Sequence, residues 1–156
     1  MISLIVACTK KLVIGINNKI PWHISEDFKH FKNYTLNKTI LMGKNTYFSI
    51  GKPLPMRKTI VVCNDEELII NHPDVVVKKD LFEVLNEYKN KNEELVVCGG
   101  AMIYKLSLPY VDKLIISEIK NDYEGDAFFP TFSNEFTLIS SEDKKDFIIK
   151  IYERRK

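Results

Sequence analysis

The stretch LVVCGGAMIYKL, residues 95–106, passes from an apolar run through two glycines into a helical pattern. Its β-branched start predicts a strand over residues 95–98 that is buried on both faces, and Gly99-Gly100 ends it. A short helix is predicted from about 101 to 106. The stretch TILMGKNTYFSI, residues 39–50, repeats the order of apolar strand, glycine and helix. Strands that lead into helices in this way predict an α/β fold with a mostly parallel sheet.

The strands outside these two units are also marked by apolar runs. Further strands are predicted over residues 2–8, 58–63, 74–77, 112–119, about 135–141 and about 146–153. The last two are joined by the charged turn 142–145, which predicts an antiparallel hairpin at the end of the chain.

Two more helices complete the predicted architecture. One runs to about Tyr34 with Ser25 as its capping residue, and the other starts at Asp80, where Glu83 has capping-box spacing. The sequence therefore predicts a single domain over residues 1–156, with a mixed, mostly parallel sheet of about eight strands, an antiparallel C-terminal hairpin and about four helices.

Composition excludes several classes of protein. The 23 basic and 21 acidic residues give a formal charge of +2, which is too balanced for a protein that binds the phosphate backbone of nucleic acids. Hydrophobic residues make up 45% and charged residues 28%, as in folded domains and unlike disordered chains. No stretch approaches the roughly 18 apolar residues of a membrane span, and the apolar N-terminus lacks the basic start of a signal peptide.

The cysteines and histidines show no metal-binding or disulfide pattern. Cys8, Cys63 and Cys98 each lie in or at the end of an apolar run, without C-x-x-C spacing. We interpret them as reduced thiols of a cytoplasmic protein. The three histidines also lack the spacing of metal ligands, so no metal site is predicted.

Asp27 is the residue most indicative of chemistry, although two interpretations are open. A carboxylate in the first turn of a helix often serves only as a partner of the helix dipole. However, Asp27 shares a helix face with Phe31, so it would be partly desolvated and would need a partner rich in N–H donors. A ligand with an amidine-like pair of N–H groups could supply that partner.

Other candidate residues lie in loops and at strand ends. The segment 9–24 is long for a loop, and its turn signals include Gly15 and Pro21-Trp22, which indicates a functional or mobile loop. The glycines that open the helices near residues 43 and 99 are compatible with phosphate binding or with plain turns. Arg57 could clamp a carboxylate or simply be solvated.

Taken in order, the motifs of the chain closely resemble those of bacterial dihydrofolate reductases, from Met1 to about Arg155. They are Ile14-Gly15, Ile20-Pro21-Trp22, Asp27-x-x-x-Phe31-Lys32 with Thr35, Met42-Gly43-Lys44-x-Thr46, Ser49-Ile50-Gly51, Leu54-Pro55-x-Arg57, Gly99-Gly100-x-x-x-Tyr104 and Glu124-Gly125-Asp126. The resemblance implies an oxidoreductase of one-carbon metabolism and tetrahydrofolate biosynthesis. It would reduce 7,8-dihydrofolate to 5,6,7,8-tetrahydrofolate with NADPH, by hydride transfer to C6 and protonation at N5. It also implies a cytoplasmic monomer that binds antifolates such as methotrexate or trimethoprim.

The resemblance assigns catalytic and substrate-binding residues. Asp27 matches the carboxylate that binds the pterin and promotes its protonation, Ser117 stands where the family usually has Thr, and Trp22 matches a tryptophan that orders water. The implied substrate pocket comprises Ile5, Ala7, Asp27, Phe28, Phe31, Lys32, Ile50, Leu54, Arg57, Cys98 and Ser117. Among these, Arg57 would hold the α-carboxylate of the substrate.

The implied cofactor site covers both halves of NADPH. Residues around the nicotinamide half would be Ala7, Ile14, Gly15, Asn18 and Ile20. The remaining cofactor contacts would come from Gly43, Lys44, Asn45, Thr46, Cys63, Asn64, Cys98, Gly99, Gly100, Ala101, Met102, Ile103 and Tyr104. The family also implies a cis peptide between Gly99 and Gly100, closure of the segment 9–24 over the nicotinamide, and hydrogen bonds from that segment to Asp126.

The chain departs from the family at the adenosine 2′-phosphate. Family members often hold this phosphate with Arg, His and Ser, whereas this chain has Lys44, Asn45 and Asn64, and the acidic residues 65–67 follow. Met102 stands where many relatives have Arg. Fewer cations and nearby acids predict a weaker grip on the phosphate.

Two other functions remain open from the sequence. A reductase of a related heterocycle, such as the pyrimidine reductases of riboflavin synthesis, would keep the cofactor site and lose the pterin acid, but Asp27, Phe31 and Arg57 argue against it. A non-catalytic folate- or nucleotide-binding module is the other alternative, and Asp27, Trp22 and Gly15 argue against it.

Overall fold

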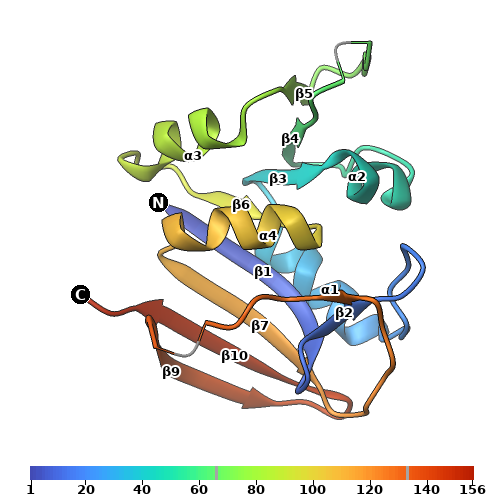
Figure 1. The fold of residues 1–156 in the computed structure, drawn as a ribbon, viewed down its shortest axis with the longest axis vertical. Coiled ribbons are helices and arrows are strands. Elements are labelled where there is room, and N and C mark those ends of the chain that lie inside the picture. Colours follow the sequence, from blue (N-terminus) through green and yellow to red (C-terminus); the bar gives the residue numbers. More distant parts are fainter. Residues whose placement is uncertain (66, 133) are drawn as a thin grey trace.

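The computed structural model describes residues 1–65, 67–132 and 134–156 (Figure 1). The described strands are β1 (Ile2–Thr9), β2 (Val13–Gly15), β3 (Thr39–Gly43), β4 (Lys58–Val62), β5 (Val75–Lys78), β6 (Leu95–Val97), β7 (Lys113–Ile119), β8 (Ala127–Phe128), β9 (Phe136–Asp143) and β10 (Phe147–Arg154). The described α-helices are α1 (Ser25–Thr35), α2 (Lys44–Ile50), α3 (Leu81–Lys89) and α4 (Ala101–Ser107), and a 3-10 helix, η1 (Leu108–Tyr110), follows α4.

Eight strands form one sheet in the order β5-β4-β3-β6-β1-β7-β10-β9. All neighbouring pairs from β5 to β7 are parallel, whereas β10 is antiparallel to both β7 and β9. The predicted fold class is therefore confirmed: a mostly parallel sheet with an antiparallel C-terminal hairpin and four α-helices among the described residues. Parallel neighbours need crossover connections, and α2 supplies the one from β3 to β4, whereas residues 63–74 join β4 to β5 without a helix among their described residues.

Helices cover both faces of the sheet, as the apolar side chains on the central strand require. In β1, Ile2, Leu4, Val6 and Cys8 pack in a cluster with the apolar residues of α3 and α4. Ile5 points to the other face, where the second cluster contains Tyr47 of α2 and is flanked by residues of α1. This alternation along one strand follows from the two-residue period of β-structure. Figure 1 shows α4 in front of β1 and α1 behind it.

Two local predictions are wrong. Ser25 is not the capping residue of α1, because Ile24 occupies that position, no side-chain cap forms, and the Ile24 carbonyl accepts from the backbone N–H of Asp27 and Phe28. The segment 9–24 is also not entirely a loop, since Val13–Gly15 pairs with Ala127–Phe128 in a separate two-stranded sheet. The Asp80 cap is confirmed, because its side chain accepts from the backbone N–H of Phe82 and Glu83.

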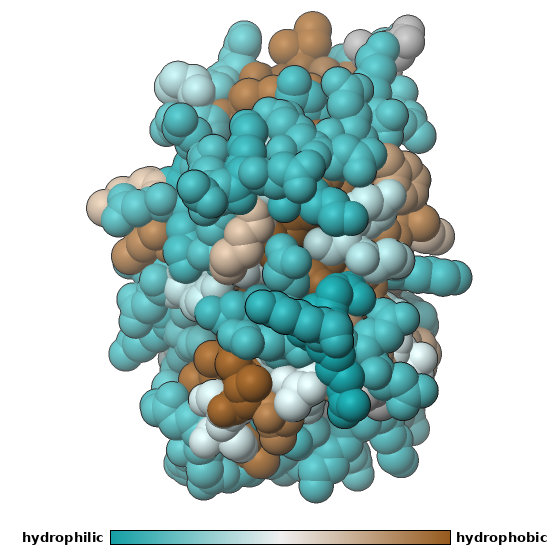
Figure 2. Space-filling view, turned by 90° about the vertical axis from the view of Figure 1, so that its left-hand side faces the viewer, coloured by the Kyte–Doolittle hydropathy of each residue, from teal (hydrophilic) through white to brown (hydrophobic). Residues whose placement is uncertain are grey.

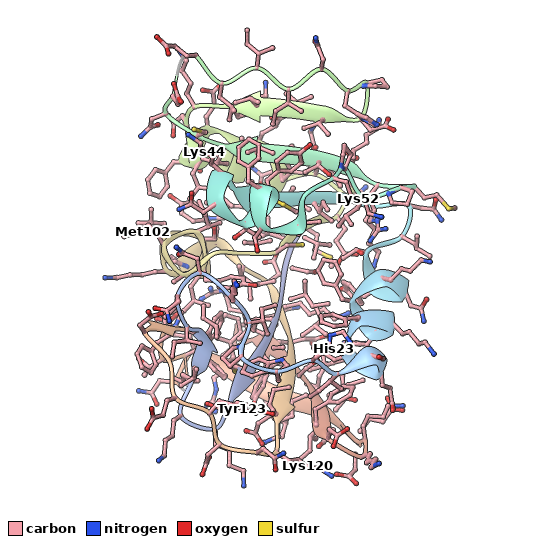
Figure 3. All side chains as sticks on the ribbon, turned by 90° about the vertical axis from the view of Figure 1, so that its right-hand side faces the viewer. His23, Lys44, Lys52, Met102, Lys120 and Tyr123 are labelled. Carbon is pink, nitrogen blue, oxygen red and sulfur yellow. The ribbon has the colours of Figure 1, made fainter. Side chains whose placement is uncertain are left out.

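The surface at one end of the parallel strands is mainly hydrophilic (Figure 2). The face at the amino ends of these strands, seen in Figure 2, is covered mainly by hydrophilic side chains with smaller apolar areas between them. Among the described residues, no helix has both the length and the apolar character that crossing a membrane requires. Figure 3 faces the opposite end of the strands and labels Lys44 and Met102 on that side of the molecule.

Candidate active site

The carboxyl ends of four neighbouring strands bring the candidate residues together. Ala7 of β1 pairs in register with Ser117 of β7. Cys98, just after β6, donates its backbone N–H to the carbonyl of Leu41 in β3 at 2.8 Å. The backbone N–H of Gly43 then donates to the Gly99 carbonyl at 2.9 Å. Open α/β sheets place ligands outside the carboxyl ends of their strands, so this edge is the expected location of a site.

Asp27 is a buried carboxylate at the start of α1. Its exposed fraction is only 8%, which excludes the interpretation of a solvated partner of the helix dipole. Burial raises the pKa of the Asp27 carboxyl above its usual value, whereas a hydrogen bond with the Ser117 side chain and the nearby His30 lower it. The structure thus brings Asp27 and Ser117 together, as predicted. A carboxyl group in this setting can retain a proton to a higher pH than a solvated aspartate.

Trp22 anchors the loop that precedes α1. Its side chain is 5% exposed and packs with Ile119, Phe147 and Ile149 of the sheet. The ring of Tyr123, from the segment after β7, lies 5.3 Å from the ring of Trp22 at an interplanar angle of 56°. This aromatic contact joins two loops that are distant in the sequence.

Hydrogen bonds join the same two loops closer to β2. Asn17 donates its backbone N–H to Asp126 Oδ2 at 3.1 Å, and the backbone N–H of Asp126 donates to the Gly15 carbonyl at 3.0 Å. The expectation that Asp126 accepts a hydrogen bond from this segment is confirmed. The loop residues Asn18 and Ile20 remain exposed, so the side chains beyond this anchor are open to contact with a ligand.

Arg57 is held by residues on two sides. Its side chain is 5% exposed, Nε donates to the Pro55 carbonyl at 2.9 Å, and Nη1 donates to Thr35 Oγ1 at 3.1 Å. Thr35 Oγ1 in turn donates to the Phe31 carbonyl at 2.8 Å. Arg57 is therefore not simply solvated, since its guanidinium group is fixed against the C-terminal end of α1. A fixed guanidinium fork suits bidentate binding of a carboxylate.

The apolar residues that the resemblance assigns to the substrate pocket differ in how far they are buried. Ile5 is buried in the second cluster, which Phe31, Leu54 and Cys98 flank as partly buried residues. Phe28 and Ile50 are 42% and 37% exposed. Lys32 is exposed on the same helix as Phe28 and Phe31. Exposed apolar side chains with polar neighbours are typical of ligand-binding grooves.

The two glycine turns lie side by side and are closely packed. The peptide bond between Gly99 and Gly100 is cis, as the resemblance implied. A Cβ atom on Gly100 would lie 3.2 Å from Thr46 Oγ1, and one on Gly43 would lie 3.2 Å from Ile103 Cγ1. The hydroxyl of the buried Tyr104 lies 2.9 Å from the Ile5 carbonyl and 2.8 Å from the Cys98 carbonyl, so it ties β1 to the end of β6.

A groove of about 580 Å³ extends from these turns across the end of β4, within the usual range of ligand pockets. Its lining comprises Val62, Cys63, Asn64, Lys79, Asp80, Leu81, Phe82, Met102, Ile103 and Leu106. Lys44, the first residue of α2, forms an ion pair with Asp65, next to the lining residue Asn64. Figure 3 shows Lys44 and Met102 on one side of the molecule and His23 on the other.

Comparisons with known proteins decide the family. The family model described as "Dihydrofolate reductase" matches residues 1–154. The chain belongs to the dihydrofolate reductase family. A dihydrofolate reductase of Buchnera aphidicola subsp. Acyrthosiphon pisum is 45% identical over 132 residues, which cover 84% of this chain and 80% of that protein. A reductase of Staphylococcus haemolyticus is 38% identical over 161 residues, covering 98% of this chain and 95% of the relative.

The fold comparison agrees with the sequence comparison. A dihydrofolate reductase from Enterococcus faecalis, complexed with NADP(H) and RAB-propyl, superposes with a TM-score of 0.89 at 29% identity. The alignment covers 100% of this chain and 97% of that chain. This chain is therefore an oxidoreductase whose reaction is the NADPH-dependent reduction of dihydrofolate, which favours the first of the three functions considered.

The structure of this reductase adds residues that the sequence did not single out. Tyr123 packs on Trp22. Thr35, which the sequence marks only as a motif residue, accepts a hydrogen bond from Arg57. His30 lies one helical turn after Asp27, and its Nε2 atom is buried with no hydrogen-bond partner among the described residues. No cluster of three or more potential metal ligands occurs in the described part of the chain.

Proposed function

We propose that this reductase converts 7,8-dihydrofolate to 5,6,7,8-tetrahydrofolate through Asp27, Ser117 and Trp22, with hydride transfer to C6 and protonation at N5. The observation that carries the proposal is the buried Asp27 carboxyl, held by Ser117 at the end of β7. A carboxylate at this position matches the pair of N–H donors that the pterin presents at its 2-amino group and N3. The pairing fixes the pterin ring in the site.

Asp27 also explains how the site supplies a proton at neutral pH. Because burial raises the pKa of its carboxyl, Asp27 is a better proton source near neutrality than an exposed aspartate would be. Ser117 orients the carboxyl through its hydrogen bond. Trp22, buried beside this group of residues, limits and orders the water that reaches the pterin.

The rest of the substrate lies along α1. The pterin and benzoyl rings contact Ile5, Ala7, Phe28, Phe31, Ile50, Leu54 and Cys98, and the carboxylate tail reaches Arg57, with Lys32 near the tail. Support for this path comes from the exposed apolar surfaces of Phe28 and Ile50 and from the fixed guanidinium of Arg57.

The residues at the strand ends fit a dinucleotide cofactor. The groove at the end of β4 suits the adenosine half, and the adjacent glycine turns at residues 43 and 99 allow close approach of the phosphates. When bound, NADPH supplies the hydride. Residues Ala7, Ile14, Gly15, Asn18 and Ile20 enclose the nicotinamide half, and the loop that Asp126 anchors excludes water from it.

We further propose that residues 1–156 act as a single domain and as a cytoplasmic monomer that also binds antifolates such as methotrexate or trimethoprim. Three cysteines with free thiols support a reducing compartment. Antifolates carry the same paired N–H donors that Asp27 requires, so they would compete with dihydrofolate for this carboxyl.

The test compares Asp27→Asn with the wild type in a spectrophotometric assay that follows oxidation of NADPH by dihydrofolate. The variant should lose roughly a hundredfold to ten-thousandfold in turnover at neutral pH, because it removes the group that supplies the proton. The loss should shrink at low pH, where the solution protonates the substrate. Glu26→Gln is the matched control, since Glu26 is the adjacent carboxylate and pairs with Lys144 on the surface. Turnover near the wild-type rate for Asp27→Asn at neutral pH would remove Asp27 from the mechanism.

A further inference from the structure

Lys44 and Asp65 form an ion pair at the rim of the adenosine groove. Lys44 Nζ lies 3.4 Å from Asp65 Oδ2, and the two side chains are 42% and 44% exposed. Asp65 is also fixed by its own backbone: Oδ1 accepts from the Glu67 N–H at 2.9 Å, and the Asp65 N–H donates to Cys63 Sγ at 3.3 Å. The carboxylate is therefore anchored in the loop after β4 and directed at Lys44.

The hydrogen bonds around Asp65 favour its charged form. Its pKa is lowered by the hydrogen bond from the Glu67 backbone and by the hydrogen bond from Lys44. A full negative charge thus stands beside Lys44 at neutral pH. Because both groups face solvent, this charge also acts on any ligand anion that approaches Lys44.

Among the described residues, charges of both signs meet at the groove. Lys79 and Asp80 line it, and the ion pair of Lys44 with Asp65 lies next to its lining residue Asn64. Met102, which is 64% exposed, also lines the groove and contributes an apolar surface. A ribose 2′-phosphate carries up to two negative charges and is bound by basic side chains, whereas a free ribose 2′-hydroxyl is commonly bound by a carboxylate.

We propose that Asp65 is a specificity residue of this reductase. By pairing with Lys44, Asp65 reduces the preference of the enzyme for NADPH over NADH. The inference rests on the proposed function, because it takes the adenosine end of the cofactor to lie in this groove. Binding of the 2′-phosphate must break or share the ion pair and meets a like charge. The 2′-hydroxyl of NADH meets no such penalty and can donate to the carboxylate.

The test measures dissociation constants of NADPH and NADH by isothermal titration calorimetry, without dihydrofolate. Relative to wild type, Asp65→Asn should raise the ratio Kd(NADH)/Kd(NADPH) by roughly tenfold, because removal of one like charge beside an anion acts on that order. The rise should shrink at high salt, where the charge is screened. Lys44→Gln should lower the same ratio by weakening NADPH alone.

Asp143→Asn is the matched control for net charge. Asp143 also pairs with a lysine, Lys120 Nζ at 2.8 Å, but lies at the far end of β9. It should leave the ratio unchanged. The proposal is overturned if Asp65→Asn leaves the ratio at the wild-type value or shifts it no more than Asp143→Asn does.

The same samples separate this inference from the proposed function. A shifted ratio in a protein that does not reduce dihydrofolate would support the role of Asp65 and refute the proposed catalysis. An unshifted ratio in an active enzyme would refute the role of Asp65 alone. Failure of wild-type protein to bind either cofactor would refute both.

Discussion

Replacement of Arg57 by lysine tests how the site recognises the tail of its substrate. The guanidinium group uses two of its five N–H groups to reach the Pro55 carbonyl at 2.9 Å and Thr35 Oγ1 at 3.1 Å. Lysine keeps the positive charge but has one nitrogen, so it cannot hold these partners and a carboxylate in the same planar arrangement. Arg57→Lys therefore keeps the positive charge but removes the planar arrangement of hydrogen-bond donors.

The structure allows the size of the effect to be worked out. Bidentate binding of a carboxylate provides two charged hydrogen bonds, and lysine retains one of them. The loss of one charged hydrogen bond costs about 2 kcal/mol, which corresponds to roughly a 30-fold rise in KM for dihydrofolate. The internal hydrogen bond of Arg57 to Thr35 is buried and the one to Pro55 is partly buried, so Tm should also fall, by about 2–8 °C.

The assay compares dihydrofolate with a dihydropterin that lacks the benzoylglutamate tail. We expect KM for dihydrofolate to rise roughly 30-fold in Arg57→Lys. KM for the tail-free substrate should stay close to the wild-type value. Thr35→Val is the companion variant, since it removes one anchor of the guanidinium but leaves the fork intact; its effect on dihydrofolate should be smaller and of the same kind.

Equal losses on both substrates would refute this reasoning. Such a result would mean that Arg57 maintains the fold of the site through Pro55 and Thr35, and that the carboxylate is bound elsewhere. An unchanged KM for dihydrofolate together with a lowered Tm would lead to the same conclusion.

Three further predictions concern the loops and the buried acid. Tyr123→Ala should shift the fluorescence emission of Trp22, the single tryptophan of the chain, to longer wavelength, because the change removes a ring 5.3 Å away. Tyr123→Phe keeps the ring and should leave the emission unshifted. Identical spectra for the two variants would contradict the contact. Asp27→Asn should be more thermostable than wild type at neutral pH, because the pKa of Asp27 is raised in the folded protein and wild-type stability therefore falls as pH rises through that pKa. The difference in Tm between variant and wild type should grow from about pH 4 to pH 8. A difference that stays constant with pH would contradict this sign. Gly125→Ala would place a Cβ atom 2.5 Å from the Gly15 carbonyl oxygen, so thermal melts should reveal a destabilisation of about 1–3 kcal/mol, whereas a wild-type Tm would show that β2 can shift freely.

The sequence predicts elements well where the signal is local. Apolar β-branched runs such as residues 2–8 and 95–98 mark the central strands because burial on both faces demands them. The Asp80 cap is likewise readable, since its partners are two and three residues away. The fold class follows from these local patterns and their order, whereas the family is indicated by the resemblance of the ordered motifs to those of dihydrofolate reductases.

The contacts that complete the site are long-range, and no local pattern carries them. Strand β2 has three residues and exists because it pairs with β8, more than a hundred residues later in the chain. The sequence alone is equally compatible with a solvated Arg57, and its hydrogen bond to Thr35 decides the matter. The ion pair of Lys44 with Asp65 depends on the conformation of the loop after β4. Secondary-structure propensities therefore do not predict contacts between segments that are distant in the sequence.

The segment before α1 is held in place differently from the residues of the site. Asp27 and Ser117 lie on a helix and a central strand, which the buried clusters hold in place. The segment before α1 is instead held at two points, by Asp126 near β2 and by the contact of Trp22 with Tyr123. The hydrogen bond to Asp126 is exposed, so it can open at modest cost, whereas Trp22 is buried and holds the segment more firmly. If closure of this segment controls access to the nicotinamide, then residues of the 120–126 loop should affect turnover without touching either ligand.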